Sequence, residues 1–285
     1  MKLKLSLILT TLAVLPLVAA ELRESTLVQV VNDVNIAAPQ AAEKAAKAND
    51  LVRAPDKVRT GAKSRAELKA ADNTLTRIGA NTVFSFEQSG RTLNLEKGSV
   101  LFHSPAGRGG GTIKSAGASA AVLGTTLIVA ATPGGGFKCI FLEGQGSITL
   151  INGKSLRITA GDMVHIPAGA PKFGDVVKVD LGKLVRGSQL VNGFAAPLPT
   201  MSDIQNEISK QAIAIISGTY EETGVMIGRV GSANDPLPIN PILAQNATLP
   251  PVVIDPQSTG GRGGSITLGY GVYPVQVQNN GPRVP

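Results

Sequence analysis

The sequence is poor in cysteine, histidine and aromatic residues, and each shortage excludes a class of structure. Cys139 is the single cysteine among 285 residues, which excludes an intramolecular disulfide. With two histidines, His103 and His165, and one cysteine, the chain lacks the ligand sets typical of zinc sites. Tryptophan is absent and aromatic residues make up 4%, so the core must be built mainly from aliphatic side chains. This composition favours short strands of Val, Ile and Leu.

Long apolar runs are also scarce, and the one that exists lies at the N-terminus. Two lysines precede a mainly apolar run at 5–18, and small residues follow it up to Ala20. The run has about 14 residues, against the roughly 20 that a membrane-spanning helix needs. We therefore interpret 1–20 as a signal peptide cleaved between Ala20 and Glu21. The mature chain is expected to be periplasmic or extracellular, without a transmembrane helix.

The charge is mildly basic. Lysine and arginine outnumber aspartate and glutamate by 27 to 20, for a formal net charge of +7. Loss of Lys2 and Lys4 with the signal peptide leaves +5 (7 − 2). Such an excess weakly favours anionic components of the cell envelope. Because the protein is expected to be exported, nucleic acid is not expected as a partner.

Glycine and proline are abundant, with 33 and 18 residues, which indicates many turns. A first strand is predicted at 27–36, and 37–54 is either a short exposed helix or a solvated excursion. From 56 to 181, short apolar segments alternate with turn signals every 8 to 12 residues or so. Asn152-Gly153 marks the clearest hairpin, with a predicted type I′ turn. The pattern predicts an all-β fold of antiparallel strands: a sandwich, a barrel or a twisted double sheet.

The C-terminal third differs in character. A helical stripe at 201–216 contains Ile204, Ile208 and Ile215, and Ser202 or Asp203 is its predicted cap. The chain then divides into a signal peptide (1–20), a β domain (21–182), a linker (183–199), a helix (200–217) and a Pro/Gly-rich, mostly irregular tail (218–285). We expect a chain ending at residue 182 to stay folded, and to lose about 1–3 kcal/mol if the helix docks.

Several motifs of the β region stand in a recognisable order. They are Val58-Arg59-Thr60-Gly61 with Ser64-Arg65-Ala66-Glu67-Leu68, the stretch 72–79 ending in Gly79, the turn at Gly98, Gly124-Thr125, and Leu142-Glu143-Gly144. Together they resemble the FecR domain over about residues 27–180. The resembling signature residues are Thr60, Gly61, Ser64, Arg65, Glu67, Leu68, Gly79, Gly98, Gly124, Thr125, Glu143 and Gly144. We interpret them as structural: glycines at strand boundaries, hydroxyls that bond turns, and a solvated Arg65–Glu67 pair.

The resemblance implies a regulatory role, with one departure. FecR regulators of iron-transport signalling carry a cytoplasmic segment that holds a sigma factor, then a membrane helix, then the FecR domain. Here a signal peptide and one strand precede the FecR-like region, so direct contact with a sigma factor is not expected.

Other motifs are weaker. Residues 161–172 resemble the second cupin motif, but Lys172 stands where a metal-binding histidine would be. The glycine-rich stretch 107–115 lacks the Gly-Lys pair of a phosphate-binding loop, and no Gly-x-Ser-x-Gly elbow is present. No catalytic residue, cofactor or metal is therefore predicted.

We interpret the chain as a non-enzymatic binding or signalling module of the envelope. Its loops at 106–111 and 133–136 are expected to meet an envelope protein or surface polymer. Two alternatives stay open: a cupin-like small-molecule-binding barrel, which elemental analysis would reveal, and a self-associating structural surface component.

Overall fold

Strand β9 (Thr92–Ser104) organises the fold because its two halves belong to different sheet layers. Residues 92–97 pair with β8 (Val83–Phe86) and β10 (Gly111–Lys114), whereas residues 98–104 pair with β7 (Leu75–Ile78) and β12 (Thr125–Thr132). The strand changes layer at Gly98, where φ is +85° and a Cβ would collide with Thr82. Only glycine fits this bend without strain.

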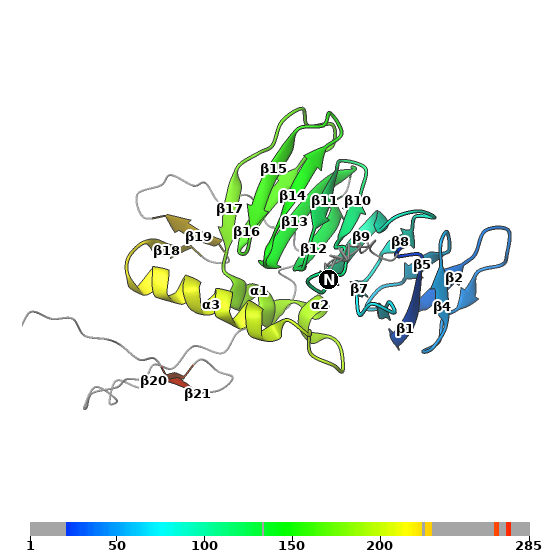
Figure 1. The fold of residues 1–285 in the computed structure, drawn as a ribbon, viewed down its shortest axis with the longest axis horizontal. Coiled ribbons are helices and arrows are strands. Elements are labelled where there is room, and N and C mark those ends of the chain that lie inside the picture. Colours follow the sequence, from blue (N-terminus) through cyan, green and yellow to red (C-terminus); the bar gives the residue numbers. More distant parts are fainter. Residues whose placement is uncertain (1–20, 133, 224–225, 230–264, 268–271, 275–285) are drawn as a thin grey trace, which may run out of the picture. The chain divides into compact units, whose positions relative to one another are not determined.

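The computed structural model describes residues 21–132, 134–223, 226–229, 265–267 and 272–274 (Figure 1). One layer, sheet A, runs in the order β4 (Leu51–Arg53), β1 (Glu24–Val31), β6 (Arg65–Lys69), β7, β9, β12, β13 (Gly136–Glu143), β16 (Asp162–Ile166), β17 (Val176–Val179), β19 (Met226–Arg229) and β18 (Tyr220–Thr223). The other layer, sheet B, runs in the order β3 (Lys44–Ala45), β2 (Val34–Ala37), β5 (Lys57–Thr60), β8, β9, β10, β11 (Ala118–Val122), β14 (Gln145–Leu150) and β15 (Ser155–Thr159). The all-β prediction is confirmed.

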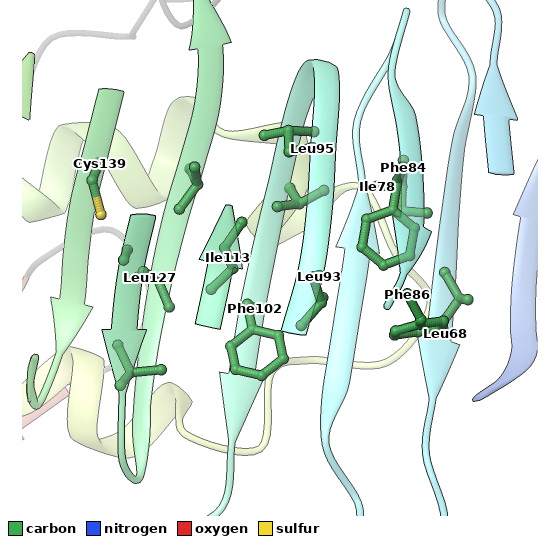
Figure 2. Packing of buried hydrophobic residues seen from close by; sticks show 14 of the residues in the cluster. Leu68, Ile78, Phe84, Phe86, Leu93, Leu95, Phe102, Ile113, Leu127 and Cys139 are labelled. Atoms are coloured by element: carbon green, nitrogen blue, oxygen red, sulfur yellow. The ribbon is translucent and has the colours of Figure 1, made fainter. Parts of the chain in front are cut away.

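The first core combines side chains of both layers, on the period-2 alternation of strands. Phe84, Leu93 and Ile113 come from sheet B, and Phe102 and Leu127 from sheet A, all 0% exposed (Figure 2). The thiol of Cys139 belongs to this core, where burial raises its pKa. The core is thus aliphatic with a few phenylalanines, as the composition predicted.

A second core lies on the other face of sheet A, and the C-terminal helices cover it. Helices α1 (Leu181–Gly187), α2 (Gln189–Asn192) and α3 (Met201–Ile216) follow β17 directly. The side chains of sheet A and of residues 181–204 that meet there are Leu75, Leu101, Ile128, Ile140, Leu142, Met163, Val177, Val179, Leu181, Leu184, Val185, Leu190, Val191, Leu198 and Ile204. Residues 183–199 are therefore not a linker: their apolar side chains are needed to bury the second face of sheet A.

The predicted helix is present as α3, but its cap differs from the prediction. Thr200 occupies the N-cap position without a side-chain cap bond, and Asp203 lies in the first turn. The Thr200 hydroxyl bonds Thr126 of β12 instead, at 2.8 Å. The helix is thus fastened to the sheet at its start, and Ile204 is fully buried there.

Three local features of the β region depart from expectation. The 150–154 hairpin has a three-residue turn with positive φ at Gly153 alone, so it is not type I′. The β9–β10 pair is parallel, since residues 105–110 return the chain to the start of β9. The stretch 37–54 forms no helix, because it supplies β3, β4 and the buried side chain of Val52.

The start of the predicted tail continues sheet A through the β18–β19 hairpin, which pairs with β17. A separate unit, 244–285, contains the two-stranded pair β20 (Ser265–Thr267) and β21 (Val272–Pro274). The rest of the tail lies outside the described residues. Within the described ranges, no helix has the length and hydropathy needed to cross a membrane.

Candidate functional site

The helix-facing surface of sheet A carries the most concentrated polar chemistry of the described residues. At its centre lies Arg77 of β7, which is 0% exposed. Its Nε lies 2.6 Å from Oε2 of Glu67 on the neighbouring strand, and Glu67 is itself 5% exposed. Burial lowers the pKa of Arg77, and the Glu67 carboxylate opposes this shift. A buried pair of this kind is tolerated only when its remaining donors are satisfied.

The remaining donors of Arg77 bind the backbone of the segment after α1. The two Nη atoms donate to the carbonyl oxygens of Leu190, Val191 and Ala196 at 3.2, 2.7 and 2.5 Å. The guanidinium carbon also lies 4.5 Å from the ring centroid of Phe194. Arg77 thus holds the segment 190–196 against the sheet.

Two further side chains of sheet A hold the same segment. Arg65 donates through Nε to the carbonyl oxygen of Gly193 and lies 5.9 Å from the Phe194 ring centroid. Gln29 Oε1 accepts a bond from the Ala195 amide at 2.9 Å. The predicted solvated Arg65–Glu67 pair is therefore wrong: both residues face away from the first core, but the helices cover that face. Glu67 binds Arg77, and Arg65 binds the backbone.

A second polar cluster fastens the start of α3. The Thr126 hydroxyl donates to Oε1 of Glu143 at 2.7 Å and lies 3.0 Å from His103 Nδ1 and 2.8 Å from the Thr200 hydroxyl. His103 and Glu143 are 4% and 8% exposed. The cluster joins three adjacent strands to the N-cap of α3.

Burial and nearby acids shift the ionisation of this cluster. Burial raises the pKa of Glu143; the hydroxyl of Thr126 opposes this rise, whereas Asp203 and Glu207 of α3 add to it. Burial lowers the pKa of His103, and Asp203 opposes that shift. The neutral forms of both groups are thus favoured beneath the helix.

We expect Glu143→Gln to stabilise the protein at neutral pH but not at pH 4. Because its pKa is raised, Glu143 contributes stability while protonated, and this contribution is lost as pH rises through its folded-state pKa. Glutamine cannot ionise, so the variant should gain on the order of 1 kcal/mol relative to wild type above that pKa. Denaturant unfolding between pH 4 and pH 8 measures the difference. A difference that does not change with pH would contradict the assignment.

The other predicted signature residues hold turns together. Thr60 Oγ1 donates to the Gly79 carbonyl at 2.6 Å and accepts from the Thr82 amide at 2.9 Å. Thr82 Oγ1 in turn accepts from the Ser99 amide at 3.0 Å, beside Gly98. These bonds tie the ends of β5 and β7 and the start of β8 to the bend in the middle of β9.

Two more signature groups lie at other turns. Ser64 Oγ accepts from the Asp33 amide at 3.0 Å, and the Gly61 amide donates to the Asp33 carbonyl at 2.9 Å. Thr125 Oγ1 donates to the Gln145 carbonyl at 2.9 Å. The glycines on either side of that bond are Gly124 and Gly144, both with positive φ. Leu68 is fully buried in the first core.

The remaining predicted positions are dispersed. Ala20 lies outside the described residues, and Glu21 forms an exposed ion pair with Arg23. The cupin-like motif forms β16 and a turn at 167–170, and Lys172 is exposed. In the described part of the chain, no group of three or more His, Cys, Asp or Glu side chains is placed to hold a metal ion.

Sequence reasoning missed Arg77, Gln29, Thr126 and Phe194. These residues make the docking contacts, by which residues 190–196 and the start of α3 are held against sheet A. Arg77 lies in a strand whose neighbours Thr76 and Ile78 are buried, and all four residues of β7 are buried. The sequence showed only an arginine within a predicted strand; the burial of that strand, in which an arginine must be paired, became visible in the structure.

Comparison with known proteins identifies the central region. Residues 56–145 match the sequence model of the FecR protein family, which confirms the predicted FecR domain. Two crystal structures of a candidate anti-sigma factor from Parabacteroides distasonis are similar at 13% identity, with TM-scores of 0.39 and 0.38. The matches cover 60% and 61% of this chain and 97% of that chain. No curated protein matches the chain.

Proposed function

Because residues 56–145 carry a FecR domain, we propose that the chain is an exported, non-enzymatic interaction module that serves signalling in the cell envelope. The FecR match is the observation that carries this proposal. The internal use of the polar side chains supports it: Glu67, Arg77, His103 and Glu143 are each bonded within the fold. Because these side chains are bonded within the fold, they stabilise the scaffold, and the exposed loops remain available to bind a partner.

The loops best suited to a partner lie at strand ends. Residues 106–109 are exposed, and positive φ at Gly107 and Gly109 shapes this turn. A second loop contains Gly134 and Gly135, also with positive φ. Exposed loops on a rigid β scaffold are common sites of recognition. The partner is an envelope protein or surface polymer; an exported chain would not meet a cytoplasmic sigma factor.

Export is tested by the mature N-terminus. We expect Edman or mass-spectrometric sequencing of the envelope or secreted fraction to begin at Glu21, because small residues precede this bond. A chain that begins at Met1, or one that stays in the cytoplasm, would contradict the export part of the proposal.

The interaction role is tested by photo-crosslinking in intact cells. A photoreactive residue at Arg108 or Gly134 should form adducts with an envelope component, identified by mass spectrometry. The matched control is Lys44, an exposed residue of β3 on the edge strand of sheet B. Adducts at Lys44 alone, or at none of the three positions, would argue against recognition by these loops.

A further inference from the structure

Lys138 of β13 differs from the other buried charged residues of the described chain. It is 4% exposed, comparable to Glu67, Arg77 and Glu143. Each of those three binds another side chain, whereas Lys138 has no hydrogen-bond or ion-pair partner among the described residues. An ammonium group without a counterion is costly to bury. Among the described residues, Lys138 is thus a largely buried cation whose charge no other side chain neutralises.

The amine end of Lys138 is not wholly enclosed. Within the described ranges, Ser104 Oγ is fully buried without a hydrogen-bond partner, whereas the Lys138 amine, which also has no partner, is not fully buried. The aliphatic stem is thus covered while the Nζ end keeps a path to solvent. The charged end is therefore the accessible part of this side chain.

His165 and Ala130 flank Lys138 on the adjacent strands. Lys138 is in register with His165 of β16 on one side and with Ala130 of β12 on the other. Directly opposite side chains in an antiparallel pair have Cβ atoms about 5 Å apart. The His165 ring also has no hydrogen-bond partner in the part of the chain that the structure describes. On the β12 side, Ala130 presents only a methyl group to the lysine.

The pKa values of both side chains are shifted towards the neutral forms. Burial lowers the pKa of Lys138, and no carboxylate opposes this shift. Burial also lowers the pKa of His165, and Lys138 lowers it further. Asp175, the nearby acid before β17, is exposed. A bound anion would reverse both shifts.

We propose that Lys138 and His165 form a binding site for a single oxyanion group, either a carboxylate or a phosphate. The lysine supplies an ammonium donor, and the imidazole supplies a second donor from the neighbouring strand. This inference goes beyond the proposed envelope function and does not depend on it. Either anion fits the same two donors, so the source is decided by the test.

The test titrates the full chain with sodium phosphate and with sodium acetate at pH 6.5, at constant ionic strength made up with chloride. Saturable binding is expected by calorimetry, with a matching shift of the His165 ring resonances in wild-type protein. Lys138→Met should weaken binding at least about tenfold, while Lys172→Met, an exposed lysine beyond the same strand β16, should bind as wild type does. Without anion, Lys138→Met should melt at a higher temperature than wild type, because it removes a partly desolvated ammonium group that has no counterion among the described residues.

Each outcome decides the proposal. Saturation by acetate alone identifies a carboxylate site, saturation by phosphate alone identifies a phosphate site, and saturation by both identifies a site that accepts either oxyanion. If neither anion differs from chloride, or if Lys138→Met binds as tightly as wild type, the site is refuted. If Lys138→Met folds poorly, the His165 ring resonances of the wild-type protein still test the site. Resonances that do not shift when either anion is added would refute it.

Discussion

Replacing Arg77 by methionine is expected to lower the free energy of unfolding by about 3–5 kcal/mol, the typical cost of breaking a buried ion pair by removing one partner. The substitution leaves the Glu67 carboxylate buried without its cation. It also leaves the carbonyl oxygens of the 190–196 segment without their donor. Urea unfolding monitored by far-ultraviolet circular dichroism measures the loss.

Two companion variants distinguish the effect of breaking the buried ion pair from the effect of removing an arginine. Arg59→Met is the surface control, because Arg59 pairs with Glu43 at 3.6 Å while both side chains are nearly half exposed. It should cost less than about 1 kcal/mol. The double variant Glu67→Met, Arg77→Met should be more stable than Arg77→Met alone, since no unpaired carboxylate remains. An Arg77→Met variant as stable as Arg59→Met would show that the docking contacts contribute little.

The sequence predicted the β architecture well because its signals are local. Gly153 and the apolar alternation around it mark a hairpin within ten residues, and the Ile204 stripe marks α3 within one helix. The parallel β9–β10 pair was not predicted, because pairing of strands separated by a returning loop leaves no periodic trace. The pleat of β6 correctly placed Glu67 away from the first core, but local periodicity does not reveal that a later segment covers it.

The contacts that hold residues 190–196 against sheet A could not be predicted from the sequence for the same reason. Arg77 meets its carbonyl partners 113 to 119 residues further along the chain. The partner segment lies within residues 183–199, which also contain Gly187, Gly193 and Pro197 and so resemble a linker in composition. Its apolar residues Leu190 and Val191 belong to a helix of four residues, too short to show a helical period. Only the tertiary structure shows that residues 181–204 form a third layer.

Ending the chain at residue 182 is expected to abolish cooperative folding, which replaces the earlier expectation of a dispensable C-terminal region. The truncation removes six side chains of the second core. Each contributes about 1.5–3 kcal/mol by burial, and the lower end of their combined contribution is about 9 kcal/mol. That is as large as the stability of a typical domain, about 5–15 kcal/mol. The exposed strand residues, such as Leu101, Ile128 and Ile140, would also form an apolar patch that favours aggregation.

The matched control is a chain that ends at Leu243, the limit of the first unit. It keeps α1 to α3 and the β18–β19 hairpin, so it should melt cooperatively and close to the full chain. Size-exclusion chromatography and thermal melts of both truncations decide between the two views. A monomeric chain ending at residue 182 with a sharp melt would show that the strands fold without their third layer. In that case the Arg77 contacts would only attach the helices to a sheet that folds without them. Arg77→Met should then lower the free energy of unfolding by about as much as the truncation does.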